Sequence, residues 1–339
     1  MPLPVGTPAP VAVSPRSATT PQLPKNGASR IIDRSTRDSA GFSDYTMRFF
    51  SVSSIFLSLA LLLTGCFEHK PARQEIVATS LDTPNKQVVT FLNLSIPDGM
   101  KTNSLPVFPE SLADFPALRR LSLRNQSRLA TLPPAVATAS ALTELDLSYT
   151  GIVSLPDSLS ALPKLQHLYL SGIGYKSLPD NLPSLPALRY LNLDRNALES
   201  LPDSIGQFST LRWVRLNENK LTSLPASTAN WKDIRRLYLR GNNLTKLPEA
   251  ILEMTSLEQL DLGDNDLDSL PEELCTKLPN LTRIDLDGNK RLAKLPEAFG
   301  KMPALTHVFL YGTAVAADTN ELERIRRDAP DPVRFFIAF

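Results

Sequence analysis

The chain has 339 residues, of which 42% are hydrophobic, so it can bury a substantial core. Its 36 Lys and Arg residues nearly balance its 35 Asp and Glu residues, which argues against a nucleic-acid partner because phosphates demand a surplus of positive charge. The two cysteines, Cys66 and Cys275, lie far apart, and there are only three histidines, so we expect neither a disulfide framework, a metal site nor a cofactor.

The first segment, residues 1–46, is rich in proline, serine, threonine and alanine. No apolar periodicity runs through it, so it cannot bury enough surface to offset the entropy that ordering would cost. The composition therefore predicts a disordered segment.

The second segment, residues 47–66, has the organisation of a secretory signal peptide. It begins at Met47, continues through an apolar run of about 15 residues, and ends in Leu63-Thr64-Gly65-Cys66. The run is shorter than the roughly 20 residues that a membrane-spanning helix needs. The last four residues resemble the lipobox of bacterial lipoproteins. That resemblance implies that Cys66 is acylated, that the peptide before it is removed, and that the lipidated cysteine attaches the protein to a membrane.

The position of this signal and the residue after it predict a location. Because such a signal belongs at the N-terminus, we expect translation to start at Met47 and residues 1–46 to be an untranslated extension. Phe67 stands where lipoproteins retained in the inner membrane carry aspartate, so the resemblance favours the outer membrane of a bacterial envelope. Two alternatives stay open: residues 1–46 are the export signal of an effector secreted into a host cell, or the lipobox is a chance match.

From Val89 onward one pattern repeats, after a predicted tether and weak N-terminal cap over residues 67–88. The spacing L-x-x-L-x-L recurs in ten units over residues 89–328, and the five consecutive spacings from Leu142 to Leu257 are each 23 residues. Within one unit, Leu191 and Leu193 alternate with polar residues, which predicts a short strand with one buried face. No unit can bury its apolar face alone, so the units must stack. The unit starts are Val89, Leu118, Leu142, Leu165, Leu188, Leu211, Ile234, Leu257, Leu281 and Leu305.

The period and the leucine spacing resemble those of the leucine-rich-repeat family. The stretch Leu221-Thr222-Ser223-Leu224-Pro225 is similar to repeats of its plant intracellular and bacterial members. The resemblance implies an α/β solenoid, a horseshoe with a parallel β-sheet on the concave side and short helical or extended segments on the convex side. It also implies that asparagines inside the turns bond neighbouring backbone groups that would otherwise be buried unpaired. This predicted ladder comprises Asn196, Asn219, Asn242, Asn265 and Asn289.

The C-terminal end carries the signals of a cap, which a solenoid needs in order to cover its last apolar edge. Residues 318–328 predict a helix with Leu322 and Ile325 turned inward. Residues 329–339 then predict a C-terminal cap that closes the last edge of the sheet.

The third, fifth and seventh residues of each unit are expected to face solvent on the concave side. In the central units these positions collect aromatic residues and arginines, the types enriched at binding hot spots. Folding does not require an outward-facing tryptophan, so we predict that a protein partner binds here; the alternative is ordinary variation of an exposed surface. The predicted partner-binding residues are His167, Tyr169, Tyr190, Trp213, Arg215, Arg236, Tyr238 and Arg240.

The remaining polar residues do not point to catalysis. His167 and His307 occupy equivalent positions six units apart, about 29 Å at strand spacing, so they cannot share a substrate. Cys275 falls where the repeat carries a buried residue, and a thiol in apolar surroundings is inert. We therefore expect a non-catalytic binding scaffold. A group of four aspartates is predicted to be a solvated rim, with calcium binding as the alternative. These are Asp261, Asp264, Asp285 and Asp287.

Overall fold

The computed structural model describes residues 75–100, 111–331 and 336–339. The segment predicted to be disordered, the signal-like segment and Cys66 lie outside these ranges. Within them, no helix has both the length and the apolar character required to cross a membrane.

Within the described residues, twelve short strands form one parallel sheet in which spatial order follows chain order. The register sets equivalent residues of successive units side by side: His167 lies opposite Tyr190, and Tyr190 lies opposite Trp213. This arrangement confirms the predicted α/β solenoid with a parallel sheet on one side. The strands are β1 (Val77–Ala78), β2 (Phe91–Asn93), β3 (Arg120–Ser122), β4 (Glu144–Asp146), β5 (His167–Tyr169), β6 (Tyr190–Asn192), β7 (Trp213–Arg215), β8 (Arg236–Tyr238), β9 (Gln259–Asp261), β10 (Arg283–Asp285), β11 (His307–Phe309) and β12 (Phe336–Ala338).

Each strand follows from the alternation of apolar and polar residues within its unit. In β6, Leu191 is 2% exposed and the following Leu193 is fully buried, whereas Tyr190 and Asn192 are half-buried on the other face. The inward residues of successive units pack on one another and form one continuous apolar core. The sheet therefore presents one face to this core and leaves the other for surface chemistry.

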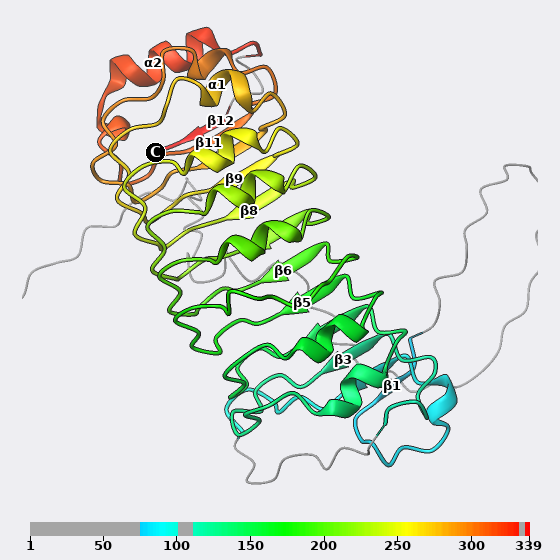
Figure 1. Ribbon diagram of the computed structural model, residues 1–339. Helices are drawn as coiled ribbons and strands as arrows, with labels where there is room; N and C mark the ends of the chain where they lie inside the picture. Colours follow the sequence, from blue (N-terminus) through cyan, green and yellow to red (C-terminus); the bar gives the residue numbers. More distant parts are fainter. Residues whose placement is uncertain (1–74, 101–110, 332–335) are drawn as a thin grey trace, which may run out of the picture. The chain divides into compact units, whose positions relative to one another are not determined.

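Short helices line the side of the core opposite the sheet (Figure 1). Pro202 directly precedes one of them, Asp203–Gln207, and supplies a fixed φ without an N–H group that would lack a partner there. Ile205 and Phe208 fill the core from this side, and the indole N–H of Trp231 donates to the carbonyl of Ile205 at 3.1 Å. The helices are η2 (Lys86–Val88), η3 (Pro134–Thr138), η4 (Asp157–Ala161), η5 (Asp203–Gln207), η6 (Ala226–Asn230), η7 (Glu249–Glu253), α1 (Leu274–Lys277), η8 (Phe299–Lys301), η9 (Val315–Ala317) and α2 (Thr319–Asp328).

Asparagine side chains join successive repeats at the turn that follows each central strand. The amide of Asn242 donates to the carbonyls of Leu216 and Leu239 at 2.9 Å each, and its oxygen accepts from the N–H of Leu221 at 3.0 Å. Leu216 and Leu221 belong to the preceding unit, so one side chain satisfies backbone groups of two repeats. Related bonds to neighbouring backbone groups are made by Asn196, Asn219, Asn265 and Asn289.

Both ends of the sheet carry a strand beyond the regular units. β1 pairs with β2 and lies within residues 67–88, for which the sequence predicted only a tether and a weak cap; two residues are too few to show a period. At the other end the predicted helix forms as α2, capped by the Asp318 carboxylate, with Leu322 and Ile325 buried. β12 then pairs with β11.

The first prediction tests the asparagine ladder. Replacing Asn242 with alanine should lower the free energy of unfolding by about 1–3 kcal/mol, because two carbonyls and one N–H lose their buried partner. The control is Asn243→Ala at the adjacent exposed asparagine. Urea denaturation of both variants measures the difference. Equal losses of stability would contradict the ladder.

Candidate functional site

The central part of the concave face carries a continuous group of aromatic rings, which we call the aromatic band. It consists of His167 and Tyr169 on β5, Tyr190 on β6, Trp213 on β7 and Tyr238 on β8. All five side chains are half-buried. The parallel register brings these residues together from four units of the sequence.

The rings of the aromatic band contact one another across the strands. Tyr190 lies at the centre: its ring centroid is 4.9 Å from that of Tyr169, 5.1 Å from that of Trp213 and 6.1 Å from that of His167. The Tyr190 and Trp213 rings meet edge to face, and Trp213 lies 6.2 Å from Tyr238. These separations lie in the range in which aromatic pairs attract, so the rings hold one another in place before any partner arrives.

Three arginines predicted for partner binding have different surroundings. Arg236 lies over the Trp213 ring at 4.9 Å and has no carboxylate partner among the described residues. Arg215 lies over Tyr238 at 5.3 Å but is also paired with Asp194 at 2.6 Å. Arg236 is therefore the member whose charge remains free for a partner.

Arg240 has a different environment from the other two. Its side chain is 22% exposed, and its guanidinium pairs with Asp264 and Asp285 at 2.6 Å and with Asp261 at 3.3 Å. The prediction of a solvated acidic rim is wrong for Asp261 and Asp285, whose side chains are 15% and 10% exposed. Arg240 supplies the positive charge that a cation would have to bring, and nothing in this arrangement favours calcium.

Burial and charge act together on these aspartates. Burial, together with the neighbouring Asp285 carboxylate, raises the pKa of Asp261 to about 6, and Arg240 opposes the rise. Burial likewise raises the pKa of Asp285. The cluster therefore depends on Arg240 to keep buried carboxylates ionised.

The seventh position of the unit does not face solvent in several repeats, which corrects the sequence prediction. Ser148, Ser171 and Asp194 are 1%, 6% and 6% exposed. The physical reason is that side chains at this position bond the backbone of the next repeat where the strand ends. Asp194 accepts from the N–H of Asn217 at 2.7 Å, and the Ser171 hydroxyl donates to the carbonyl of Asp194 at 3.0 Å.

Asparagine and aspartate at the fifth position also form hydrogen bonds that stabilise the fold. Their side chains accept from the N–H two residues later at Asp146, Asn192, Asp261 and Asp285.

A second set of exposed residues, at the edge of the sheet where the central strands begin, was not predicted from the sequence, and we call it the arginine row. Arg189, Arg212 and Arg235 directly precede β6, β7 and β8, and their side chains are exposed. They occupy the second position of three consecutive units, which was not considered as a surface column. The signal that would have found them is the same residue type recurring at a spacing of 23.

Burial and charge also affect the titratable rings. Burial lowers the pKa of His167, and the charges of Arg120 and Arg189 add to this while Glu144 opposes it. Burial raises the pKa of Tyr190 to about 12. At neutral pH the aromatic band is therefore uncharged, and the charge beside it comes from arginine.

The indole N–H of Trp213 is a donor without a partner. It is buried and has no hydrogen-bond acceptor among the described residues. Buried donors are normally paired, so the unpaired indole N–H of Trp213 departs from that rule.

Other aromatic residues gather at the C-terminal end of the sheet. Phe336 of β12 lies 6.0 Å from His307 and 6.1 Å from Phe309, and Arg283 lies over Phe309 at 4.1 Å. Phe336 lies in the segment predicted to be the C-terminal cap, outside the repeated units, so the repeat period does not predict its place beside β11. This cluster lacks an adjacent row of arginines in consecutive units.

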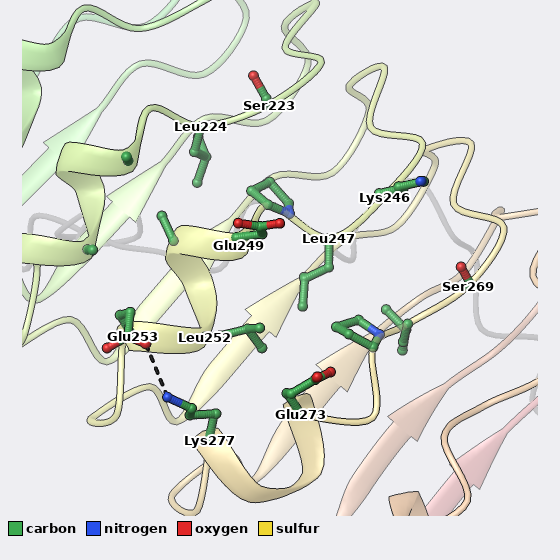
Figure 2. Close-up of a pocket in the computed structure, with 16 residues that line it drawn as sticks. Ser223, Leu224, Lys246, Leu247, Glu249, Leu252, Glu253, Ser269, Glu273 and Lys277 are labelled. Atoms are coloured by element: carbon green, nitrogen blue, oxygen red, sulfur yellow. Dashed lines mark hydrogen bonds and ion pairs between the residues drawn. The ribbon is translucent and has the colours of Figure 1, made fainter.

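The convex side holds a hollow of about 860 Å³ among η6, η7 and α1. Figure 2 shows Leu247 and Leu252 among its lining residues, with an ion pair between Glu253 and Lys277 beside them. Its charged lining has both signs, and Glu253 is also paired with Lys232. We assign no function to this hollow.

The described residues offer little for catalysis or metal binding. No three His, Cys, Asp or Glu side chains within them form a group that could hold a metal ion. Cys275 is buried, and burial raises the pKa of its thiol to about 11, so it is protonated at neutral pH.

Comparison with known proteins identifies the repeat. A family model described as leucine-rich repeat region matches residues 178–261, and one described as leucine rich repeat matches residues 116–172 and 257–315. No curated protein matches the chain. Among solved structures, the leucine-rich repeat domain of the type III effector XopL is 24% identical with a TM-score of 0.57, and the match covers 68% of this chain and 78% of that one. A leucine-rich-repeat protein of Leptospira interrogans is 23% identical with a TM-score of 0.41, over 76% of this chain and 92% of that one. At these identities the likeness concerns the fold alone.

The second prediction concerns the Arg240 cluster. Arg240→Met should destabilise the protein by about 3–5 kcal/mol near neutral pH, because Asp261 loses its cation and Asp285 keeps only the more distant Arg283, at 3.8 Å. Arg291→Met is the control: Arg291 also pairs with two aspartates but is 58% exposed, so its loss should cost less than about 1 kcal/mol.

The cost of Arg240→Met should also depend on pH. The folded-state pKa of Asp261, about 6, lies above its ordinary value, so the folded chain binds more protons than the unfolded chain between the two values. Lowering the pH through this window neutralises the carboxylate and should shrink the deficit of the variant. Denaturation at about pH 7.5 and about pH 5 measures the change. A deficit that grows at the lower pH would contradict this account.

Proposed function

The chain belongs to the leucine-rich-repeat family, and we propose that it is a non-catalytic scaffold that binds a protein partner through the aromatic band. Stacked repeats of this kind make extended concave surfaces for binding. The observation that carries the proposal is the contact of five aromatic side chains across four adjacent strands, with Arg236 resting on Trp213. Members of the family are generally binding scaffolds.

The composition of the band supports recognition of a protein surface. Tryptophan, tyrosine and arginine are the residues that most often carry large shares of binding energy at the centres of interfaces. The inward residues of β7 and its flanks, Leu211, Val214 and Leu216, are fully buried and pack the strand on the core without Trp213. The fold therefore has no need of Trp213 on the concave face, whereas a partner does.

For the location, we propose attachment to a bacterial envelope membrane through lipidated Cys66. The support is the sequence alone: a short apolar run followed by Leu63-Thr64-Gly65-Cys66. Several acyl chains make such anchoring stable, whereas one would be marginal. The second candidate, an effector secreted into a host cell, is favoured by the Pro- and Ser-rich residues 1–46 and is compatible with the structural likeness to XopL.

The third prediction tests the aromatic band. Trp213→Ala should weaken partner binding by about 2 kcal/mol or more, because a central aromatic anchor loses a large desolvated contact. Its melting temperature should stay close to that of the wild type, since the core neighbours remain. Isothermal titration with a partner captured from the host measures the affinity. The control is Asp203→Ala, an exposed change at the start of η5 on the convex side. If Asp203→Ala loses binding and Trp213→Ala does not, the partner binds the convex face and the proposed site is wrong.

The fourth prediction tests the anchor. The mature protein from its host should begin at Cys66 and carry the mass of its acyl chains, and Cys66→Ser should stop this processing because the acylated thiol is gone. Intact-mass spectrometry of the membrane fraction measures both. An unmodified chain that starts at Met1 would exclude the anchor, and transfer of a reporter fused to residues 1–46 into host cells would favour the effector.

A further inference from the structure

We propose that the partner contacts this surface through an acidic segment, whose carboxylates meet the arginine row while its apolar side chains lie on the aromatic band. The inference rests on the proposed function, since it names the chemistry of the partner of the same surface.

The backbone of the sheet sets the spacing of the arginine row. The carbonyl of Arg189 accepts from the N–H groups of Arg212 and Trp213 at 2.9 and 3.0 Å. The carbonyl of Arg212 accepts in the same way from Arg235 and Arg236 at 2.8 and 3.1 Å. The three arginines are therefore fixed one strand spacing apart, about 4.8 Å, beside the aromatic residues that follow them.

The fold leaves most of this positive charge uncompensated. Among the described residues, Arg189 and Arg212 form no ion pair, and Arg236 meets only the face of Trp213. Arg235 pairs with Glu258 at 2.8 Å, but both side chains are exposed, so the pair is weak and easily exchanged. By contrast, Arg215 and Arg240 are paired internally with half-buried or buried aspartates.

Charge complementarity indicates that the partner segment is acidic. A guanidinium binds a carboxylate through two parallel hydrogen bonds, and an exposed row of them offers several such sites in line. A basic segment would bring like charges onto the same row, which is repulsive at this spacing. The aromatic band beside the row receives apolar side chains of the partner.

A short acidic segment suits the surface better than a nucleic acid. The chain as a whole has a net charge of only +1, so it offers no extended field for a phosphate backbone. The consecutive arginines of the row span only three units, which matches a protein segment rather than a long polyanion.

The test begins with a library of random dodecamer peptides displayed on phage and selected on the full-length protein in detergent. We expect acidic sequences with aromatic or aliphatic residues to be enriched. The affinity of synthetic copies, measured by fluorescence anisotropy, should fall at least about tenfold in Arg189→Glu/Arg212→Glu. It should also fall between low and high salt, since exposed charges are screened over about 10 Å at 0.1 M salt.

The matched control changes the same amount of charge in the same part of the array. Lys220→Glu/Lys246→Glu alters two exposed lysines that lie beyond the asparagine turns of neighbouring units, and it should change the affinity by less than about twofold. Arg189→Gln/Arg212→Gln, which removes charge without reversing it, should give an intermediate loss. Melting temperatures near that of the wild type show that all three variants fold.

The outcomes separate this inference from the proposed function. Enrichment of neutral or basic peptides, equal losses in the arginine and lysine variants, or no acidic enrichment overturns the acidic partner. A competition experiment with an oligouridylate tests the nucleic-acid alternative. If the oligouridylate binds more tightly than the peptides and displaces them, the acidic partner is overturned in favour of a nucleic acid. If the selected peptides are neutral or basic and lose affinity in Trp213→Ala, the concave site stands while the acidic inference fails. If none of them does, the proposed function itself fails.

Discussion

The central part of the array depends on each repeat satisfying backbone groups of the repeat before it. The side chain of Asn242 bonds carbonyls of two units and an N–H group of the preceding one, and no unit could bury these groups alone without large cost. Because equivalent bonds recur from Asn196 to Asn289, the stacking propagates along one dimension with a constant register. The same register places the inward leucines of successive repeats against one another, so they form one continuous core.

Because the register is constant, equivalent residues of successive repeats form columns on the surface. These columns are not equally free to vary in residue type. The fifth and seventh positions repeatedly bond the backbone where the strand ends, as Asn192 and Asp194 do in β6. The third position makes no such recurring bond, so it can vary without loss of the fold. Its central stretch holds Tyr190 and Trp213, which is why the chemistry of recognition concentrates there.

The arginines show how one residue type serves two purposes in the same fold. Arg240 is enclosed by three aspartates, where its charge compensates carboxylates that burial would otherwise protonate. Arg236 lies on an aromatic ring, and the arginine row stands beside it in solvent. The first arrangement stabilises the array, and the second leaves charge for another molecule. The fold is shared with many proteins of different function, so such local chemistry carries the functional argument.

The sequence by itself determined the repeat, the parallel strands, the asparagine positions and the terminal helix, because each rests on a period or a local signal within a unit. It also named the aromatic residues of the band, since the register follows from the period. Only the tertiary structure decided which polar residues form internal hydrogen bonds and ion pairs and which remain exposed. Arg240 and Asp285 lie 45 residues apart, and burial of Ser148 and Asp194 depends on bonds at the strand ends. Such pairing depends on side-chain direction and on packing between units, which no pattern within one unit records.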